Sequence, residues 1–258
     1  MGSLPEISVN KDSYDSTNIV DVYVKTIDAG LTNQELFCLQ RIAPEDRGSV
    51  LDIGIGAGRT SKALSRFFKQ YVGIDYSTNM INAAKALFPA LDLRVMDARS
   101  LNVEQNFDCV FFSYNGIDYV DLKGRDEVLV EIKRVLKPNG YLIYSTHNLA
   151  HRRVPFWMNS FWVSELVRPW RTIHAIPARL RNRFRNFKKQ NLNRADGIGF
   201  LNDPGHGFIL ITAYVDIPHE LETLRRCGFE VDATIGNAKN VATYDSDDSW
   251  VYILARKR

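Results

Sequence analysis

The stretch that decides the fold of this 258-residue chain is Val50-Leu51-Asp52-Ile53-Gly54-Ile55-Gly56-Ala57-Gly58-Arg59-Thr60. The apolar run Ser49–Ile53 predicts a strand before the glycines, and Gly58–Lys69 predicts a helix after them. Glycines at such a junction let the backbone turn sharply and let a ligand approach the start of the helix. A plain tight turn has the same glycines, so the neighbouring residues decide whether a ligand binds there.

Two residues of this stretch distinguish between candidate ligands. A dinucleotide-binding turn has the pattern G-x-G-x-x-G/A, and Arg59 stands where its last small residue belongs when the pattern is read from Gly54. Asp52 would repel a pyrophosphate and attract a cation. S-adenosylmethionine carries a sulfonium and an ammonium group and no phosphate. With its pattern acid-x-Gly-x-Gly-x-Gly, the chain resembles the class I S-adenosylmethionine-dependent methyltransferases.

Further acids follow predicted strands at positions suited to this cofactor. Asp75 ends the second strand and is expected to accept both ribose hydroxyls, with Tyr76 on the adenine face. Asp97 is expected to accept from the adenine amino group, and the Ala98 N–H to donate to a ring nitrogen. Asp52 is expected to hold the methionine ammonium. The predicted cofactor site comprises Asp52, Gly54, Gly56, Asp75, Tyr76, Asp97, Ala98 and Ser113.

Strand and helix patterns alternate along most of the chain, which predicts a largely parallel sheet covered on both faces. Strands are predicted at Ser49–Ile53, Tyr71–Ile74, Leu91–Met96, Phe107–Phe112, Tyr141–Ser145, Phe208–Val215, Phe229–Ile235 and Trp250–Ala255. Helices are predicted at Asn18–Gly30, Thr32–Ala43, Gly58–Lys69, Thr78–Leu87, Asp126–Leu136 and Pro218–Cys227, with a turn at Lys137–Gly140. The resemblance implies an α/β, Rossmann-like, doubly wound sheet of seven strands with the last one antiparallel.

The domain organisation expected from these patterns has four parts. Residues 1–45 form an N-terminal helical lid, and residues 46–148 form the cofactor-binding core. Residues 149–206 form a basic, aromatic insertion or cap after the fifth strand, and residues 207–258 complete the core sheet.

Composition is that of an ordinary globular protein, with 45% hydrophobic and 24% charged residues and a net charge of +3. We find no signal peptide and no apolar run of the ~18 residues that a membrane span needs. The three cysteines are far apart and have no metal-binding spacing. We therefore expect a cytoplasmic protein with reduced thiols and no metal.

Charge is concentrated in the insertion, where residues 151–200 hold 11 Lys and Arg but only Glu165 and Asp196 as acids. Three interpretations remain open. The segment is a cap whose arginines are solvated, a surface that contacts anionic membrane through residues 151–194, or a site for phosphates of the acceptor, as in a sugar nucleotide, a lipid-linked glycan or RNA.

The acceptor should bind outside the carboxyl ends of the strands. His147, after the fifth strand, is the candidate general base for a hydroxyl acceptor, and a hydrogen-bonded structural histidine is the alternative. Asn115 and Asp118, after the fourth strand, are expected to orient the acceptor. His206, with Asp203, forms either a second polar pair over the site or an Asx-type turn.

These observations together predict a methyltransferase that acts on a hydroxyl of a small-molecule or glycan-like acceptor. The motif Asn/Asp-Pro-Pro-Tyr/Phe, which marks family members that methylate base amines or glutamine amides, is absent after the fourth strand. Nucleic acid is therefore not the expected partner. The alternatives are an N-methyltransferase for an amino sugar, peptide or alkaloid, and a non-catalytic lipid- or RNA-binding module with a vestigial cofactor site.

Overall fold

A computed structural model describes residues 10, 17–153, 180–184, 197–202, 208–236 and 243–258 of the chain. Most of the predicted insertion, together with Asp203 and His206, therefore lies outside the described residues. Within the described ranges, no helix has both the length and the apolar character required to span a membrane. The expected contact of residues 151–194 with anionic membrane stays a prediction.

A seven-stranded sheet forms the centre of the molecule, with the order β3-β2-β1-β4-β5-β9-β8. Its strands are β1 (Ser49–Ile53), β2 (Gln70–Asp75), β3 (Asp92–Val95), β4 (Phe107–Phe112), β5 (Leu136–His147), β8 (Phe229–Gly236) and β9 (Trp250–Lys257). The first five run parallel, whereas β9 is antiparallel to both of its neighbours. The predicted fold class, with an antiparallel last strand, is confirmed.

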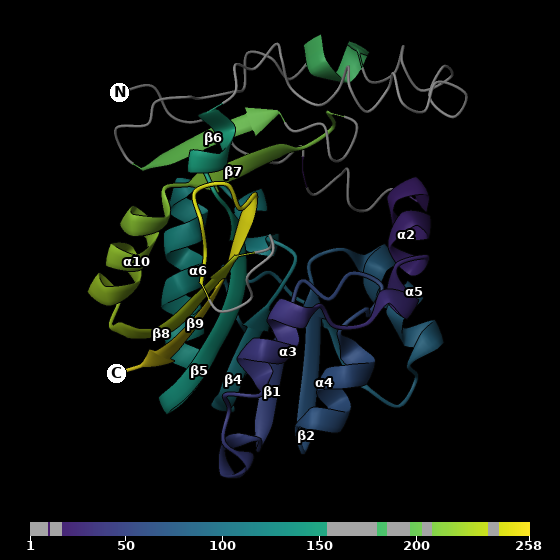
Figure 1. Cartoon of the computed structure of the whole chain (residues 1–258). Helices are drawn as coiled ribbons and strands as arrows, with labels where there is room; N and C mark the ends of the chain where they lie inside the picture. The colour runs from purple at the N-terminus through teal and green to yellow at the C-terminus, as the bar shows by residue number, and fades with distance from the viewer. Residues whose placement is uncertain (1–9, 11–16, 154–179, 185–196, 203–207, 237–242) are drawn as a thin grey trace.

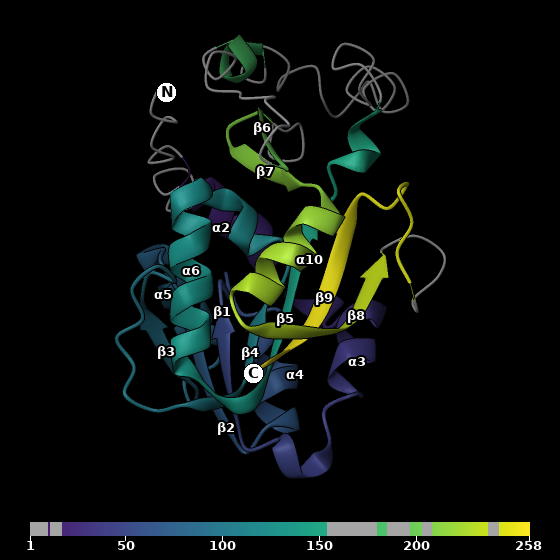
Figure 2. The ribbon, with the colours of Figure 1, turned by 90° about the vertical axis from the view of Figure 1, so that its left-hand side faces the viewer.

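Helices cover both faces of this sheet (Figures 1 and 2). They are α2 (Thr17–Val24), α3 (Asn33–Leu39), α4 (Ser61–Phe67), α5 (Thr78–Leu87), α6 (Leu122–Val135) and α10 (Ile217–Arg226). Short 3-10 turns lie at Ile27–Ala29, Pro44–Asp46, Gly116–Tyr119 and Ala150–Arg153. Alternation along the strands separates two cores: Val110 and Phe112 of β4 pack with α6 and α10, whereas Cys109 and Phe111 pack with α3 and α4.

The turn predicted at Lys137–Gly140 lies within β5 instead. This strand follows α6 directly, at Leu136, and its pairing with β4 is irregular between Phe107 and Cys109. Asn139 has a φ of 60°, a left-handed conformation that Asn tolerates better than most residues. The four residues are therefore absorbed as an irregularity at the beginning of the strand.

The strand predicted at Phe208–Val215 does not belong to the central sheet. Residues Ile211–Val215 form β7, which pairs with β6 (Ile198–Asn202) in a separate antiparallel sheet, and β6 falls inside the predicted insertion. Ile211, Ala213 and Val215 pack on the core with α6 and α10, so the alternation of β7 reflects a face that covers this core. The Leu149 N–H donates to the Val215 carbonyl, and β6 and β7 thus lie beyond the carboxyl end of β5 (Figure 1).

Candidate functional site

The glycine turn between β1 and α4 has a conformation that requires glycine. Gly54 and Gly56 have φ values of +68° and +55°, in the left-handed region that side chains rarely adopt. A Cβ atom on Gly54 would lie 2.9 Å from the Phe112 ring, and one on Gly56 would lie 3.0 Å from the Tyr23 ring. The backbone here passes close to its neighbours and leaves no room for side chains.

Asp75, at the end of β2, connects that strand to the glycine turn. The Gly56 N–H donates to its Oδ2 at 2.9 Å, and the Ser77 N–H donates to its Oδ1 at the same distance. Ser77 also caps α5 through its side chain, which accepts from the Met80 N–H. The carboxylate is therefore fixed in place beside the turn.

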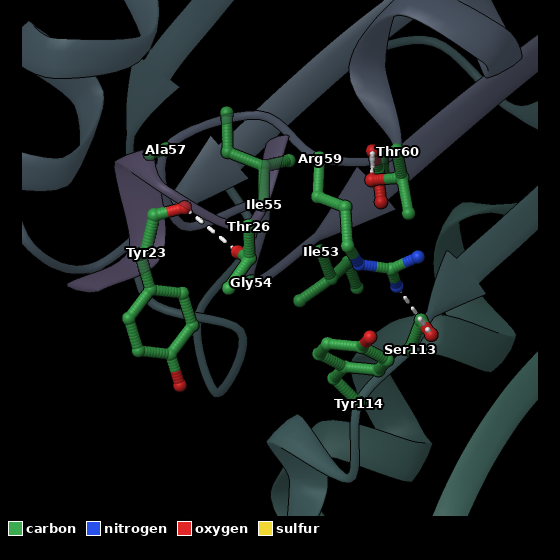
Figure 3. A pocket seen from close by; sticks show the side chains of 11 residues that line it. Tyr23, Thr26, Ile53, Gly54, Ile55, Ala57, Arg59, Thr60, Ser113 and Tyr114 are labelled. Atoms are coloured by element: carbon green, nitrogen blue, oxygen red, sulfur yellow. Dashed lines mark hydrogen bonds between the residues drawn. The ribbon is translucent and has the colours of Figure 1, made fainter. Parts of the chain in front are cut away.

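Two adjoining cavities lie beside these residues, and they share a wall made of Tyr23, Ile53, Gly54, Ser113 and Tyr114. The larger contains about 730 Å³ of empty space, including its open mouth, and is lined by Asp75, Tyr76, Asp97 and Ala98 among others. The smaller contains about 380 Å³ and is lined by Asp52 and Thr60 (Figure 3). All eight predicted cofactor residues line one cavity or both.

Asp52 is the buried carboxylate of the smaller cavity. Its Oδ2 accepts from the Thr60 hydroxyl at 2.6 Å and from the Tyr71 hydroxyl at 2.9 Å. Burial raises the pKa of the Asp52 carboxyl to about 7, although these two hydrogen bonds act in the opposite direction. In the absence of a bound cation, this carboxyl therefore gains or loses its proton near neutral pH, and a cation in the cavity would favour its ionised form.

An ion pair that the sequence analysis did not predict lies beside Asp52. The Arg59 guanidinium donates to both carboxylate oxygens of Glu35, at 2.6 and 2.9 Å, and it lies 3.7 Å from the centre of the Tyr114 ring. Glu35 is fully buried, and the Ser113 hydroxyl donates to it. Arg59 lines the smaller cavity (Figure 3). Its pair with Glu35 therefore ties helix α3 to the wall of the site.

Asp97 lies at the rim of the larger cavity. Its side chain is 39% exposed and forms an ion pair with Arg99, with 2.7 Å between Arg99 Nη2 and Asp97 Oδ2. The Arg99 N–H also donates to Oδ1. An adenine amino group would therefore share this carboxylate with Arg99.

The predicted acceptor residues His147, Asn115 and Asp118 are brought together at the carboxyl ends of β4 and β5. His147 Nδ1 lies 2.8 Å from Asp118 Oδ2, and His147 Nε2 lies 3.2 Å from Asn115 Nδ2. The Asp118 side chain is fully buried behind His147 and is paired with Arg125, and its expected role in orienting the acceptor stays a prediction. His206 lies outside the described residues.

Asn115 has two unusual features. It adopts the left-handed conformation with a φ of 57°, next to Tyr114 with a φ of 50°. Such strained positions are common at functional sites. Its Oδ1 is buried and has no hydrogen-bond partner among the described residues. Within the described ranges, the side-chain amide is held only through its Nδ2 contact with His147, while the Asn115 backbone N–H donates to Ser145 Oγ.

The described residues contain no group of three or more His, Cys, Asp or Glu side chains arranged for a metal ion.

The aromatic rings beside His147 come from β7 and β9. The Tyr214 ring centre lies 4.8 Å from the imidazole and the Trp250 ring centre 6.5 Å away. The His147 side chain is 14% exposed, so its surroundings are largely dry.

Comparison with known proteins agrees with this geometry. Residues 50–140 match the family described as a methyltransferase domain. The Ubiquinone biosynthesis O-methyltransferase of Bradyrhizobium diazoefficiens is 36% identical over 106 residues, which cover 38% of this chain and 40% of the relative. The chain thus spans well under half the length of that curated relative.

Solved structures resemble the chain over most of its length. An S-adenosylmethionine-dependent methyltransferase from Clostridium acetobutylicum has a TM-score of 0.61 at 13% identity, covering 93% of this chain and 98% of that one. An S-adenosylmethionine-bound amino pentose methyltransferase from Micromonospora echinaspora has a TM-score of 0.55 at 13% identity, covering 96% and 92%. At this identity the likeness shows the fold.

Proposed function

We propose that this chain, which carries a methyltransferase domain within a class I S-adenosylmethionine-dependent methyltransferase fold, transfers a methyl group from S-adenosylmethionine to a hydroxyl of a small-molecule or glycan-like acceptor. The observation that carries the proposal is the pair of adjoining cavities, which share the glycine turn as part of their common wall. Asp52 lines one of these cavities, and Asp75 and Asp97 line the other. The larger cavity suits a nucleoside, and the smaller one suits a charged amino-acid end.

The residues present fit this cofactor. The left-handed glycines bring the turn close to the Phe112 and Tyr23 rings, which line the larger cavity, and Asp75 is fixed beside the turn by two backbone N–H groups. Asp52 places a carboxyl where the ammonium of the methionine end would lie, and Arg59 lies in the same cavity wall. When bound, the cofactor supplies an electrophilic methyl group on its sulfonium. The chain binds it, orients it and excludes water.

On the acceptor side, His147 is the residue that takes the proton of the hydroxyl. Asp118 Oδ2 already accepts from the His147 backbone N–H, and its 2.8 Å contact with Nδ1 places the ring proton on that nitrogen. Nε2 is then the basic nitrogen, and the Asn115 amide donates to it. When the acceptor binds, its hydroxyl replaces the Asn115 amide as the hydrogen-bond donor to His147 Nε2.

The position of Asp118 also favours a hydroxyl over an amine. An amine acceptor would be favoured by a carboxylate that faces it, but Asp118 is fully buried and pairs with Arg125. The B. diazoefficiens relative is named an O-methyltransferase, which supports the same choice.

The test is incubation of the purified chain with S-adenosylmethionine and a panel of polyhydroxylated and amino-bearing acceptors, followed by mass spectrometry. We expect a gain of one methyl group on oxygen. A His147→Gln variant should lose roughly 100-fold or more of this rate, since a general base contributes about that much, and should keep its cofactor affinity. Methyl transfer to amines alone would contradict the proposed acceptor, and an undiminished rate in His147→Gln would contradict the proposed base.

A further inference from the structure

Behind His147 lies a chain of buried charges from three other elements. Asp118, in the 3-10 turn after β4, accepts from Arg125 Nη1 of α6 at 2.5 Å, and Arg125 Nη2 donates to Glu220 Oε1 of α10 at 2.7 Å. The Tyr144 hydroxyl donates to the same Glu220 oxygen at 2.7 Å. The Thr146 hydroxyl donates to Asp118 Oδ1 at 2.6 Å. The 3-10 turn, α6 and α10 thus converge on one histidine of β5.

The charges of this cluster do not balance. The side chains of Asp118, Arg125 and Glu220 are only 0%, 3% and 4% exposed. Two carboxylates and one guanidinium together carry one net negative charge. Removing each of these ions from water costs several kcal/mol of free energy. A packing role alone would be served as well by apolar side chains. Uptake of a proton by His147 would neutralise the cluster.

We infer that Arg125 and Glu220 are positioning residues that prepare His147 to accept the proton of the acceptor hydroxyl. This inference rests on the proposed function. The hydroxyl proton moves to His147 Nε2, an electron pair of the oxygen forms the new bond to the methyl carbon, and the pair of the broken carbon–sulfur bond stays on sulfur. Arg125 holds Asp118 against Nδ1, and Glu220 supplies the negative charge that the protonated imidazole compensates.

In the part of the chain that the structure describes, the other side chains in contact with His147 are uncharged. Among the described residues in contact with it, Tyr214 comes from β7, Trp250 from β9 and Asn115 from the loop after β4. Asp118 contacts the imidazole directly, and Arg125 and Glu220 act through it. Because Glu220 does not contact His147, its charge can be removed by one substitution without changing the direct contacts of the imidazole.

The experiment compares Glu220→Gln with Tyr144→Phe in the full chain. Glu220→Gln removes the charge but keeps an oxygen for Arg125, whereas Tyr144→Phe removes a hydrogen bond to Glu220 without changing the charge. The titration of His147 is followed by the NMR signal of its imidazole C–H and assigned with His147→Gln. We expect Glu220→Gln to move this titration to lower pH and to lower kcat about tenfold or more, with cofactor affinity unchanged. Tyr144→Phe should change both far less.

Two further outcomes keep the inference distinct from the proposed function. If the wild-type chain methylates no hydroxyl, the proposed function fails, but the NMR titration still tests the link between Glu220 and His147. A titration that is the same in Glu220→Gln and in wild type overturns the inference. The inference is also overturned if the decrease in the activity of Glu220→Gln is fully accounted for by a decrease in the fraction of folded protein. Arg125→Lys, which keeps the charge, should retain more activity than Arg125→Met.

Discussion

At the scale of single residues, the carboxylates of the site could be predicted from the sequence because each lies at or near the carboxyl end of a strand. Asp75 and Asp97 lie at adjacent strand ends, and parallel strands bring such ends to one edge of the sheet. Glu35 and Arg59 could not be predicted together, since 24 residues separate them and only the packing of α3 makes them partners. The sequence identifies Asp118 as a charged residue after the fourth strand. It does not show that this carboxylate is buried behind His147, because that depends on Arg125 of α6 and Glu220 of α10.

Asp52 gives the cofactor site a pH dependence. Because burial raises the pKa of its carboxyl to about 7, the free protein holds a proton there below this pH. A bound ammonium favours the ionised form, so binding expels the proton and becomes tighter as the pH rises. We predict that cofactor affinity increases by up to about tenfold per pH unit below the pKa and levels off above it. Calorimetry at several pH values measures this.

The matched variant is Asp52→Asn, which keeps the shape of the side chain but cannot ionise. Its cofactor affinity should be lower than that of the wild type and nearly constant over the same pH range. An equally steep pH dependence in Asp52→Asn would assign the effect to another group.

At the scale of elements, patterns with clear boundaries predicted the structure well. The bounds of β1, α5 and β4 are those expected, because apolar runs or caps mark both ends of each. The long helix predicted at Asn18–Gly30 is instead α2 followed by a 3-10 turn at Ile27–Ala29, and between them the Thr26 hydroxyl donates to the Tyr23 carbonyl. Hydroxyl side chains that bond nearby carbonyls compete with a regular helix. Apolar spacing alone does not show this.

The Glu35–Arg59 pair joins α3 to the glycine turn, and its loss should destabilise the fold. Glu35→Ala leaves Arg59 buried without its partner, which typically costs about 3–5 kcal/mol. Asp92→Ala breaks an ion pair with Arg94 whose side chains are 44% and 46% exposed, and this should cost about 0–1 kcal/mol. Urea unfolding of both variants measures the difference. Equal losses would mean that the buried pair has no special role in stability.

The beginning of α6 should depend on one side chain. Asp121 is its N-cap and accepts from the Gly124 N–H at 2.7 Å. Asp121→Ala should lower the free energy of unfolding by about 1 kcal/mol, whereas Asp121→Asn, which still caps, should have little effect. Denaturant unfolding distinguishes the two, and similar values for both variants would contradict the assigned cap.

At the scale of the whole molecule, the alternation of strand and helix patterns predicted the central sheet. It did not predict which segments pack around the cavities and around His147. The N-terminal α2 contributes Tyr23 to both cavities, while β7 places Tyr214 on His147. Neither role follows from local pattern, because each depends on where a segment far away in the sequence packs. The residues that line the two cavities lie between Tyr23 and Val128, whereas the surroundings of His147 also include β7 and β9.

A ligand held by so many elements should stabilise the folded state. With S-adenosylmethionine at about 100 times its Kd, the free energy of unfolding should rise by about 2.7 kcal/mol. Thermal unfolding with and without the cofactor measures the effect, and a nicotinamide dinucleotide at the same concentration serves as the control. A larger stabilisation by the dinucleotide would show that the cavities hold a different cofactor.

The central claim is that the carboxylate-flanked glycine turn binds S-adenosylmethionine, and calorimetric titration of the wild-type chain and of Asp75→Ala tests it most directly. The account predicts one site per chain in the wild type and a loss of roughly 100-fold or more in affinity for Asp75→Ala, because two charge-assisted hydrogen bonds of about 1.5–3 kcal/mol each are removed. Folded wild-type protein that does not bind S-adenosylmethionine even at millimolar concentration, or an Asp75→Ala variant that binds it as tightly as wild type, would contradict the account.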